Sequence, residues 1–202
     1  RANRPVPEDG PFWALVEETG MVVSMHGGAV GPGVPPKQVG PVQAAPPVRD
    51  QEMIAAGRAA ALGVQQSLGL FVLTGLFERF PKLKVALIET SAGWLPSFME
   101  QLDAIYLRNR PLLEPAQRLK QLPSEYLAAI KISIDREVDA IRHRERIGVH
   151  RIMVGTDFPH IGSFWPHSRY YLDLLFRDVP ADEVQAITWE NGASLYGIEF
   201  AN

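Results

Sequence analysis

Residues 21–28 of the chain read Met21-Val22-Val23-Ser24-Met25-His26-Gly27-Gly28. A short apolar run with β-branched residues that stops at two glycines is typical of a strand buried on both faces in a parallel sheet. The run ends in a histidine, so an ionisable side chain stands at the carboxyl end of the predicted strand. We therefore start from a parallel α/β fold with His26 where the first βα loop begins.

Three more strands are predicted, at residues 84–89, 130–134 and 151–157. Helical spacing is found at residues 11–18, 50–80, 92–107 and 138–147, at a short segment from 124, and in the tail from 168. Strands that alternate with helices indicate βα units around a parallel sheet. Neither a short-period repeat nor a domain boundary is visible, so residues 1–202 are predicted to form one domain.

Polar side chains close two of these later strands, which end in Glu89 and Asp157. The carboxyl ends of parallel strands meet at one edge of a sheet, where α/β proteins gather their chemistry. We therefore expect His26, Glu89 and Asp157 to lie together on one face.

Composition excludes several classes of protein. The chain has 202 residues, 46% of them hydrophobic, and a net charge of -3 without a basic block, so nucleic acid is not an expected partner. Cysteine is absent, which excludes disulfides and thiolate metal sites, and any metal must bind His and carboxylates. Arg1 in place of Met indicates a cut or processed start, no targeting segment precedes the first pattern, and we expect a cytoplasmic protein.

Two further stretches bear on the interpretation. Residues 59–77 carry no charge, but glycines and glutamines interrupt them, so a helix buried against protein is favoured over a membrane span. Residues 27–49 contain five Gly and six Pro and leave directly from His26. A connection of this length is predicted to be a lid or specificity loop, with a disordered excursion as the alternative.

Four segments, read together, resemble a known family: residues 22–28, 75–84 (Gly-Leu-Phe-Glu-Arg-Phe-Pro-Lys-Leu-Lys), 155–160 (Gly-Thr-Asp-Phe-Pro-His) and 191–197 (Asn-Gly-Ala-Ser-Leu-Tyr-Gly). In this order they are similar to the amidohydrolase-related metal-dependent hydrolases, which include aminocarboxymuconate-semialdehyde decarboxylase and aromatic-acid decarboxylases. The resemblance implies a TIM (β/α)₈ barrel and identifies the strands as the fifth to the eighth. The chain would then be the C-terminal half of the barrel, because a complete one takes about 250 residues.

The resemblance also implies site residues. His26 corresponds to a metal ligand, and Asp157 to a ligand that can also move a proton. The implied cofactor is a divalent metal, zinc first and manganese as the alternative. The family's His-x-His pair is absent from this chain, and the sixth strand ends in Glu89 or Thr90 instead of His. Glu89 is interpreted as a general base, a residue that orients a ligand, or a buried acid paired with an arginine.

Trp94, His160 and Trp165 are the candidate substrate-binding residues. The tryptophans would form the wall of an aromatic pocket, or simply pack in the core, and His160 would line the mouth of the pocket or bond the backbone.

Two hypotheses for function follow. The first is a metal-dependent enzyme that hydrolyses or decarboxylates a small carboxylated or aromatic compound. The second is a non-catalytic fragment or subunit that needs the N-terminal half-barrel in trans.

A half-barrel has two open sheet edges and an uncovered inner face. We therefore expect Val22, Val85, Leu87 and Ile152, or their neighbours, to be partly uncovered. The chain is predicted to pair with its own N-terminal half, to pair with a copy of itself as a homodimer or larger homo-oligomer, or to aggregate.

Overall fold

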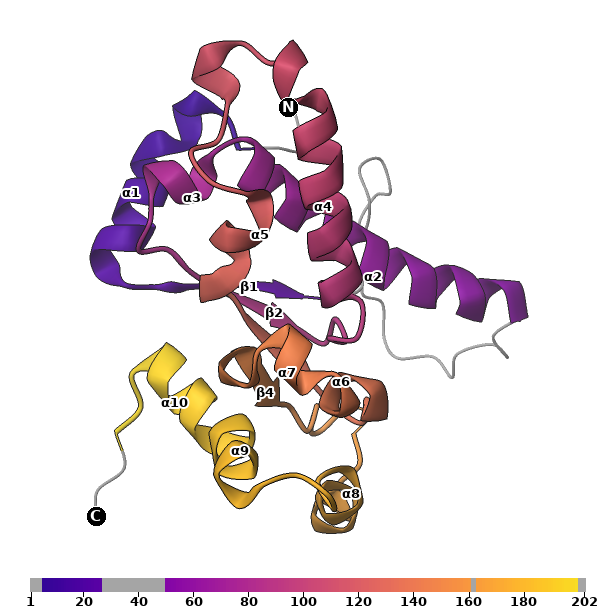
Figure 1. Ribbon diagram of the computed structural model, residues 1–202. Coiled ribbons are helices and arrows are strands. Elements are labelled where there is room, and N and C mark those ends of the chain that lie inside the picture. Colours follow the sequence, from indigo (N-terminus) through magenta and orange to yellow (C-terminus); the bar gives the residue numbers. More distant parts are fainter. Residues whose placement is uncertain (1–4, 27–49, 161–162, 200–202) are drawn as a thin grey trace, which may run out of the picture.

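The computed structural model describes residues 5–26, 50–160 and 163–199. The predicted lid at 27–49 lies outside the described residues. The described chain forms a four-stranded sheet with helices before, between and after its strands (Figure 1).

The strands are parallel and follow one another in the sheet in chain order, β1-β2-β3-β4. Their bounds are Val22–His26 for β1, Lys84–Ile88 for β2, Lys131–Ile134 for β3 and Ile152–Val154 for β4. All four predicted strands are confirmed. β4 is shorter than the predicted 151–157, because its partner β3 ends at Ile134, which pairs with Val154.

The helices of the described residues are α1 Gly10–Thr19, α2 Asp50–Leu73, α3 Leu76–Arg79, α4 Leu95–Asn109, α5 Pro123–Tyr126, α6 Val138–Arg142, α7 Arg144–Ile147, α8 Ser168–Leu175, α9 Ala181–Gln185 and α10 Asn191–Tyr196. None of these helices is long and apolar enough to cross a membrane. The single helix predicted for 50–80 is wrong, because Gly75 takes a φ of 70° and separates α2 from α3. The helix predicted for 138–147 is likewise two helices that meet at His143.

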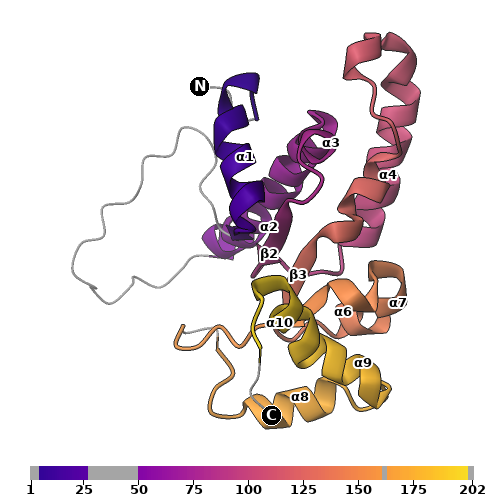
Figure 2. The same cartoon turned by 90° about the vertical axis from the view of Figure 1, so that its left-hand side faces the viewer.

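One face of the sheet is sealed by helices. Val85, Leu87 and Ile152 are at most 1% exposed, and they pack in the same core as residues of α2, α3 and α4. Our expectation that these three side chains would be partly uncovered is therefore wrong. Side chains alternate between the faces of a strand, and these three point to the face that the helices cover. Leu172 of α8 and Val184 of α9 pack against the same core, and in Figures 1 and 2 these two helices lie at the opposite end of the molecule from α1 to α3.

The opposite face is covered less completely. Ala86 and Met153 are buried there against Leu195 of α10, with half-buried Val22 and Ile88 beside them. At the open edge of the sheet, no residue of β1 is fully buried. The prediction of a strand buried on both faces is wrong for β1, because its described neighbours are β2 on one edge and helices on one face.

Asn191 ties α10 to the end of the sheet. Its amide nitrogen donates to the carbonyl oxygens of Val149 and Ile152, both at 2.8 Å, and its side chain is buried. We expect Asn191→Ala to lower the free energy of unfolding by about 2 kcal/mol, because two buried carbonyl groups lose their donor. Urea denaturation would measure the change. The exposed Thr188→Ala on the preceding turn is the control and should change stability by less than ~0.5 kcal/mol.

Candidate active site

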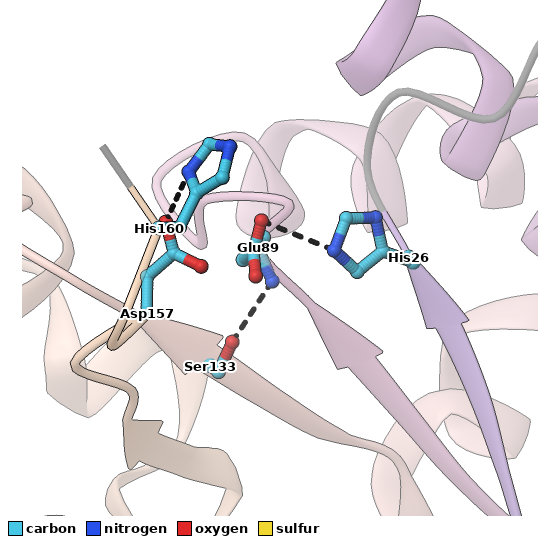
Figure 3. Close-up of polar contacts among 5 residues, drawn as sticks. All are labelled: His26, Glu89, Ser133, Asp157 and His160. Carbon is cyan, nitrogen blue, oxygen red and sulfur yellow. Dashed lines mark hydrogen bonds and ion pairs between the residues drawn. The ribbon is translucent and has the colours of Figure 1, made fainter. Parts of the chain in front are cut away.

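The predicted ionisable residues do meet at the carboxyl edge of the sheet (Figure 3). His26 is the last residue of β1, Glu89 directly follows β2, and Asp157 lies three residues beyond β4. The imidazole Nε2 of His26 is 3.1 Å from a carboxylate oxygen of Glu89. The partner of Glu89 at this contact is therefore a histidine and not the arginine that one interpretation proposed.

The backbone at two of these positions is strained. Glu89 and Asp157 have left-handed φ angles of 55° and 53°, which non-glycine residues adopt rarely and at a cost of about 1–3 kcal/mol each. The Glu89 amide donates to the hydroxyl of buried Ser133 on β3 at 3.0 Å, which holds that turn in place. Strain of this kind is concentrated at functional sites, and here it falls on both carboxylates singled out from the sequence.

His160 contacts the carboxylate of Asp157. The imidazole Nδ1 is 2.7 Å from Oδ2 of Asp157, and the His160 amide donates to the Asp157 carbonyl at 2.7 Å. The Asp157 side chain is 16% exposed, whereas that of His160 is 65% exposed. The structure shows the backbone hydrogen bond that one interpretation of His160 named, and in addition the ring contacts the Asp157 carboxylate from the solvent side.

Asp135 is a site residue that we did not single out from the sequence. It follows β3 directly and lines the same cavity as Glu89 and Asp157. Its Oδ1 atom is buried without a hydrogen-bond partner among the described residues. Burial, followed by the charges of Glu137, Asp157 and Glu89, raises the pKa of Asp135 to about 6. The sequence contains a signal for Asp135, because this polar residue follows the third predicted strand in the same way as ionisable residues end the other three strands.

Asp135 should make stability depend on pH. When folding raises the pKa of an acid, the group does not affect stability at low pH, because it is protonated in both the folded and the unfolded state. The folded state loses stability as the pH rises from the pKa of the unfolded state to the pKa of the folded state. We expect about 1 kcal/mol of stability to be lost between about pH 4 and pH 6, after allowance for solvent screening. Asp135→Asn should abolish this loss and be more stable at neutral pH, as urea denaturation across this range would measure. The exposed Asp173→Asn should retain the wild-type profile, and an unchanged profile in Asp135→Asn would contradict the assignment.

The cavity at this edge has a volume of about 390 Å³. Glu89, Asp135 and Asp157 form its polar side, and the remaining wall includes Ile88, Met153, Phe158 and Tyr196. A small compound with one apolar and one polar side fits a cavity of this size and lining.

The two predicted tryptophans are not in this wall. Trp94 lines a separate cavity beside α6, donates its indole N–H to the carbonyl of Thr90 at 2.9 Å, and packs on Phe98. Trp165 is 63% exposed and stacks on Phe158, with ring centroids 5.3 Å apart. It therefore reaches the mouth of the cavity only through Phe158.

Comparison with known proteins agrees with this geometry. The family model described as amidohydrolase matches residues 2–198. The chain belongs to the amidohydrolase family. A search of curated proteins finds no match.

Several solved amidohydrolase-type structures have the same fold. The 5-carboxyvanillate decarboxylase LigW from Sphingomonas paucimobilis is 22% identical, with a TM-score of 0.70 over 96% of this chain and 54% of that one. An amidohydrolase from Mycobacterium avium subsp. paratuberculosis K-10 is 19% identical, with a TM-score of 0.68 over 98% of this chain and 47% of that one. A dihydroxybenzoic acid decarboxylase from Polaromonas sp. JS666, with bound manganese and the inhibitor 2-nitroresorcinol, is 18% identical, with a TM-score of 0.62 over 97% and 55%. The chain spans about half the length of these structures.

The donors at the site are of the right kind for the divalent metal that such a family implies, since imidazole and carboxylate oxygen bind zinc and manganese. Within the described residues, however, no three His, Asp or Glu side chains converge on one point as a ligand group. His26 is directed at Glu89, and Asp157 at His160. Within its described residues, this amidohydrolase chain therefore does not form a complete metal-ligand group.

Proposed function

We propose that this chain is the C-terminal half, strands five to eight, of the (β/α)₈ barrel of a metal-dependent amidohydrolase-family enzyme. Its substrate would be a small aromatic or otherwise carboxylated compound, and its reaction a non-oxidative decarboxylation or a hydrolysis in the cytoplasm. The observation that carries the proposal is that Glu89, Asp135 and Asp157 line one cavity at the carboxyl edge of four consecutive parallel strands, where His26 contacts Glu89. That edge is where (β/α)₈ enzymes hold their reacting groups.

The chain's own residues have distinct proposed roles. His26 and Asp157 act as metal ligands, and Asp157 also accepts or returns a proton at its carboxylate. Glu89 orients the His26 ring through the 3.1 Å contact, or acts as a general base, and His160 orients Asp157 from the solvent side. A bound divalent ion supplies Lewis-acid polarisation of a substrate oxygen or lowers the pKa of a bound water. Zinc is the first candidate and manganese the alternative, and the manganese in the Polaromonas decarboxylase favours including both in any test.

The substrate class follows from the cavity and from the relatives. A cavity lined by Phe158 and Tyr196 together with three carboxylates suits a ring with polar substituents. The solved relatives named for their substrates act on 5-carboxyvanillate and dihydroxybenzoic acid. These names favour decarboxylation over hydrolysis as the first reaction to test. Of the proposed substrate-binding residues, His160 contacts Asp157 and Trp165 contacts Phe158, both of which line the cavity, and we assign Trp94 a packing role.

A second candidate function rests on the incomplete ligand set. Because the described residues form no group of three ligands, the chain by itself would be a non-catalytic subunit or fragment. Activity would then require its own N-terminal half-barrel, supplied in trans, or a homo-oligomer in which another copy contributes to the site.

The experiment compares two preparations with the same substrates. One is the chain 1–202 expressed alone, and the other is the native species that carries it, with its mass determined. Both are reconstituted with Mn²⁺ or Zn²⁺ and assayed for CO₂ release and for hydrolysis, using 5-carboxyvanillate and 2,6-dihydroxybenzoate first. Metal-dependent turnover by the native species alone supports the first proposal. Absence of metal binding and turnover in both preparations would contradict it.

A further inference from the structure

A larger cavity, of about 810 Å³, lies among the helices away from the strand ends. Its walls come from residues 5–7, the junction of α2 with α3, the end of α4 and residues 113–119. These segments lie at the same end of the molecule in both views (Figures 1 and 2). The volume is within the range of small-molecule sites, and the cavity shares no lining residue with the one that holds Asp157.

The walls of this helical cavity are largely apolar. Leu73 and Ile105 line it and are 40% and 47% exposed, so both present apolar surface to the cavity. Val6 and Leu113 are half-buried beside them. A ligand with an apolar body would remove this surface from water and gain roughly 25 cal/mol per Å² covered.

The carboxylate of Glu78 is already engaged by the chain. It accepts hydrogen bonds from the Lys120 amide at 2.5 Å and from the Tyr126 hydroxyl. Burial and this hydrogen bond raise the pKa of Tyr126 to about 12, so the phenol remains a donor at neutral pH. Glu78 is thus directed toward these donors and offers little to a ligand.

Two arginines give the cavity an excess of positive charge. Arg79 and Arg118 both line it, and within the described residues neither forms an ion pair with a carboxylate. The Arg79 guanidinium lies over the Phe80 ring, 5.6 Å from its centroid. Arg118 donates its Nε hydrogen to the carbonyl of Leu113 at 3.1 Å, so that its terminal nitrogens are not used by this hydrogen bond. Two guanidinium groups against one engaged carboxylate leave the lining with a net charge that attracts an anion.

We propose that this cavity binds a small amphipathic monocarboxylate, a compound with one carboxylate and an apolar body. The body lies against Leu73 and Ile105, and the carboxylate is held by Arg79 and Arg118. This site is independent of the proposed function and would exist whether or not the strand-end site is catalytic. A neutral compound of the same shape satisfies the apolar wall and leaves both guanidinium groups without a partner.

The test is isothermal titration of the full chain, in whatever assembly it forms, with sodium octanoate and with octan-1-ol. We expect octanoate to bind about tenfold more tightly than octanol, because a hydrogen bond to a charged group is worth about this factor. The double variant Arg79→Gln/Arg118→Gln should lose about tenfold in affinity for octanoate and keep its affinity for octanol. Arg108→Gln, on the exposed side of α4, is the matched control and should change neither.

Two further experiments test the proposal if the double variant folds poorly: a substitution that blocks the cavity, and an NMR titration that identifies the residues in contact with octanoate. Ala116 is exposed at the cavity, so Ala116→Trp should fill it without disturbing the core and should abolish octanoate binding. Amide shifts in a ¹H–¹⁵N spectrum should change at Leu73 and Ile105 and remain constant at Gly155. Equal affinity for octanoate and octanol, binding that survives Ala116→Trp, or no octanoate binding at millimolar concentration would each overturn the proposal.

Discussion

Turnover by the complete enzyme is expected to fall by about 10²- to 10⁴-fold in Asp157→Asn, the range that a positioned acid–base group contributes. Asparagine preserves the shape of the side chain and tolerates the left-handed φ of 53° that position 157 requires. The change therefore removes the charge and the proton-accepting carboxylate while leaving the fold intact. His26→Gln should cause a loss of similar size, because it removes the imidazole that contacts Glu89.

The measurement is kcat of the native species with the proposed aromatic carboxylates, together with the metal content of each variant. Asp173→Asn, an exposed acid on α8, is the control and should retain the wild-type rate and metal content. Circular dichroism should show that both variants remain folded. Undiminished turnover in both site variants would remove His26 and Asp157 from the proposed site.

The chain 1–202 by itself is expected not to be a stable monomer. Within the described residues β1 is bonded on one edge only, and its Ser24 and His26 are exposed. Large aromatic side chains, including Phe158, Trp165 and Tyr170, are more than half exposed near the other end of the sheet. If ~400 Å² of apolar surface remains exposed to water, the hydrophobic stabilisation of the fold is smaller by on the order of 10 kcal/mol. This loss is comparable to the free energy of unfolding of a whole domain. An open strand edge also templates pairing with another chain.

Light scattering coupled to size-exclusion chromatography would decide this point. A charge on the open strand should oppose pairing, so Ser24→Lys is expected to shift the distribution toward smaller species. Ser97→Lys adds the same charge on the exposed side of α4 and should leave the distribution unchanged. A monodisperse monomer that melts cooperatively would refute the prediction and mean that the two sheet faces are covered well enough without a partner.

Much of the fold was predictable because the strands are short apolar runs with clear ends. Each of the four predicted strands is present, and His26 and Glu89 meet within 3.1 Å as the convergence of parallel strand ends implies. Helix breaks were harder to predict. The chain turns at Gly75 through a left-handed conformation, whereas Gly63 and Gly69 lie inside α2, and composition does not distinguish these glycines.

The parts of the site that sequence reasoning missed depend on burial. Asp135 looked like an ordinary loop acid after a weak strand, and its character comes from neighbours brought up by folding, namely Glu89, Asp157 and Glu137. Trp94 was assigned to the pocket because an aromatic side chain suits an aromatic substrate, yet its indole is held by the carbonyl of Thr90 in another cavity. Strand register determines the face of the sheet to which a side chain points. A short run of apolar residues without alternation does not determine that register.

The order of the strands in the sheet is also the order in which they are synthesised on the ribosome. Each strand needs only its predecessor as a partner, since β2 adds to β1, β3 to β2 and β4 to β3. No strand has to be inserted later between two that are already paired, so each strand can join the sheet as soon as it has been synthesised. A sheet built in this way can also be lengthened by one βα unit at either margin without re-pairing the rest. Gene duplication or fusion could therefore enlarge such a scaffold stepwise.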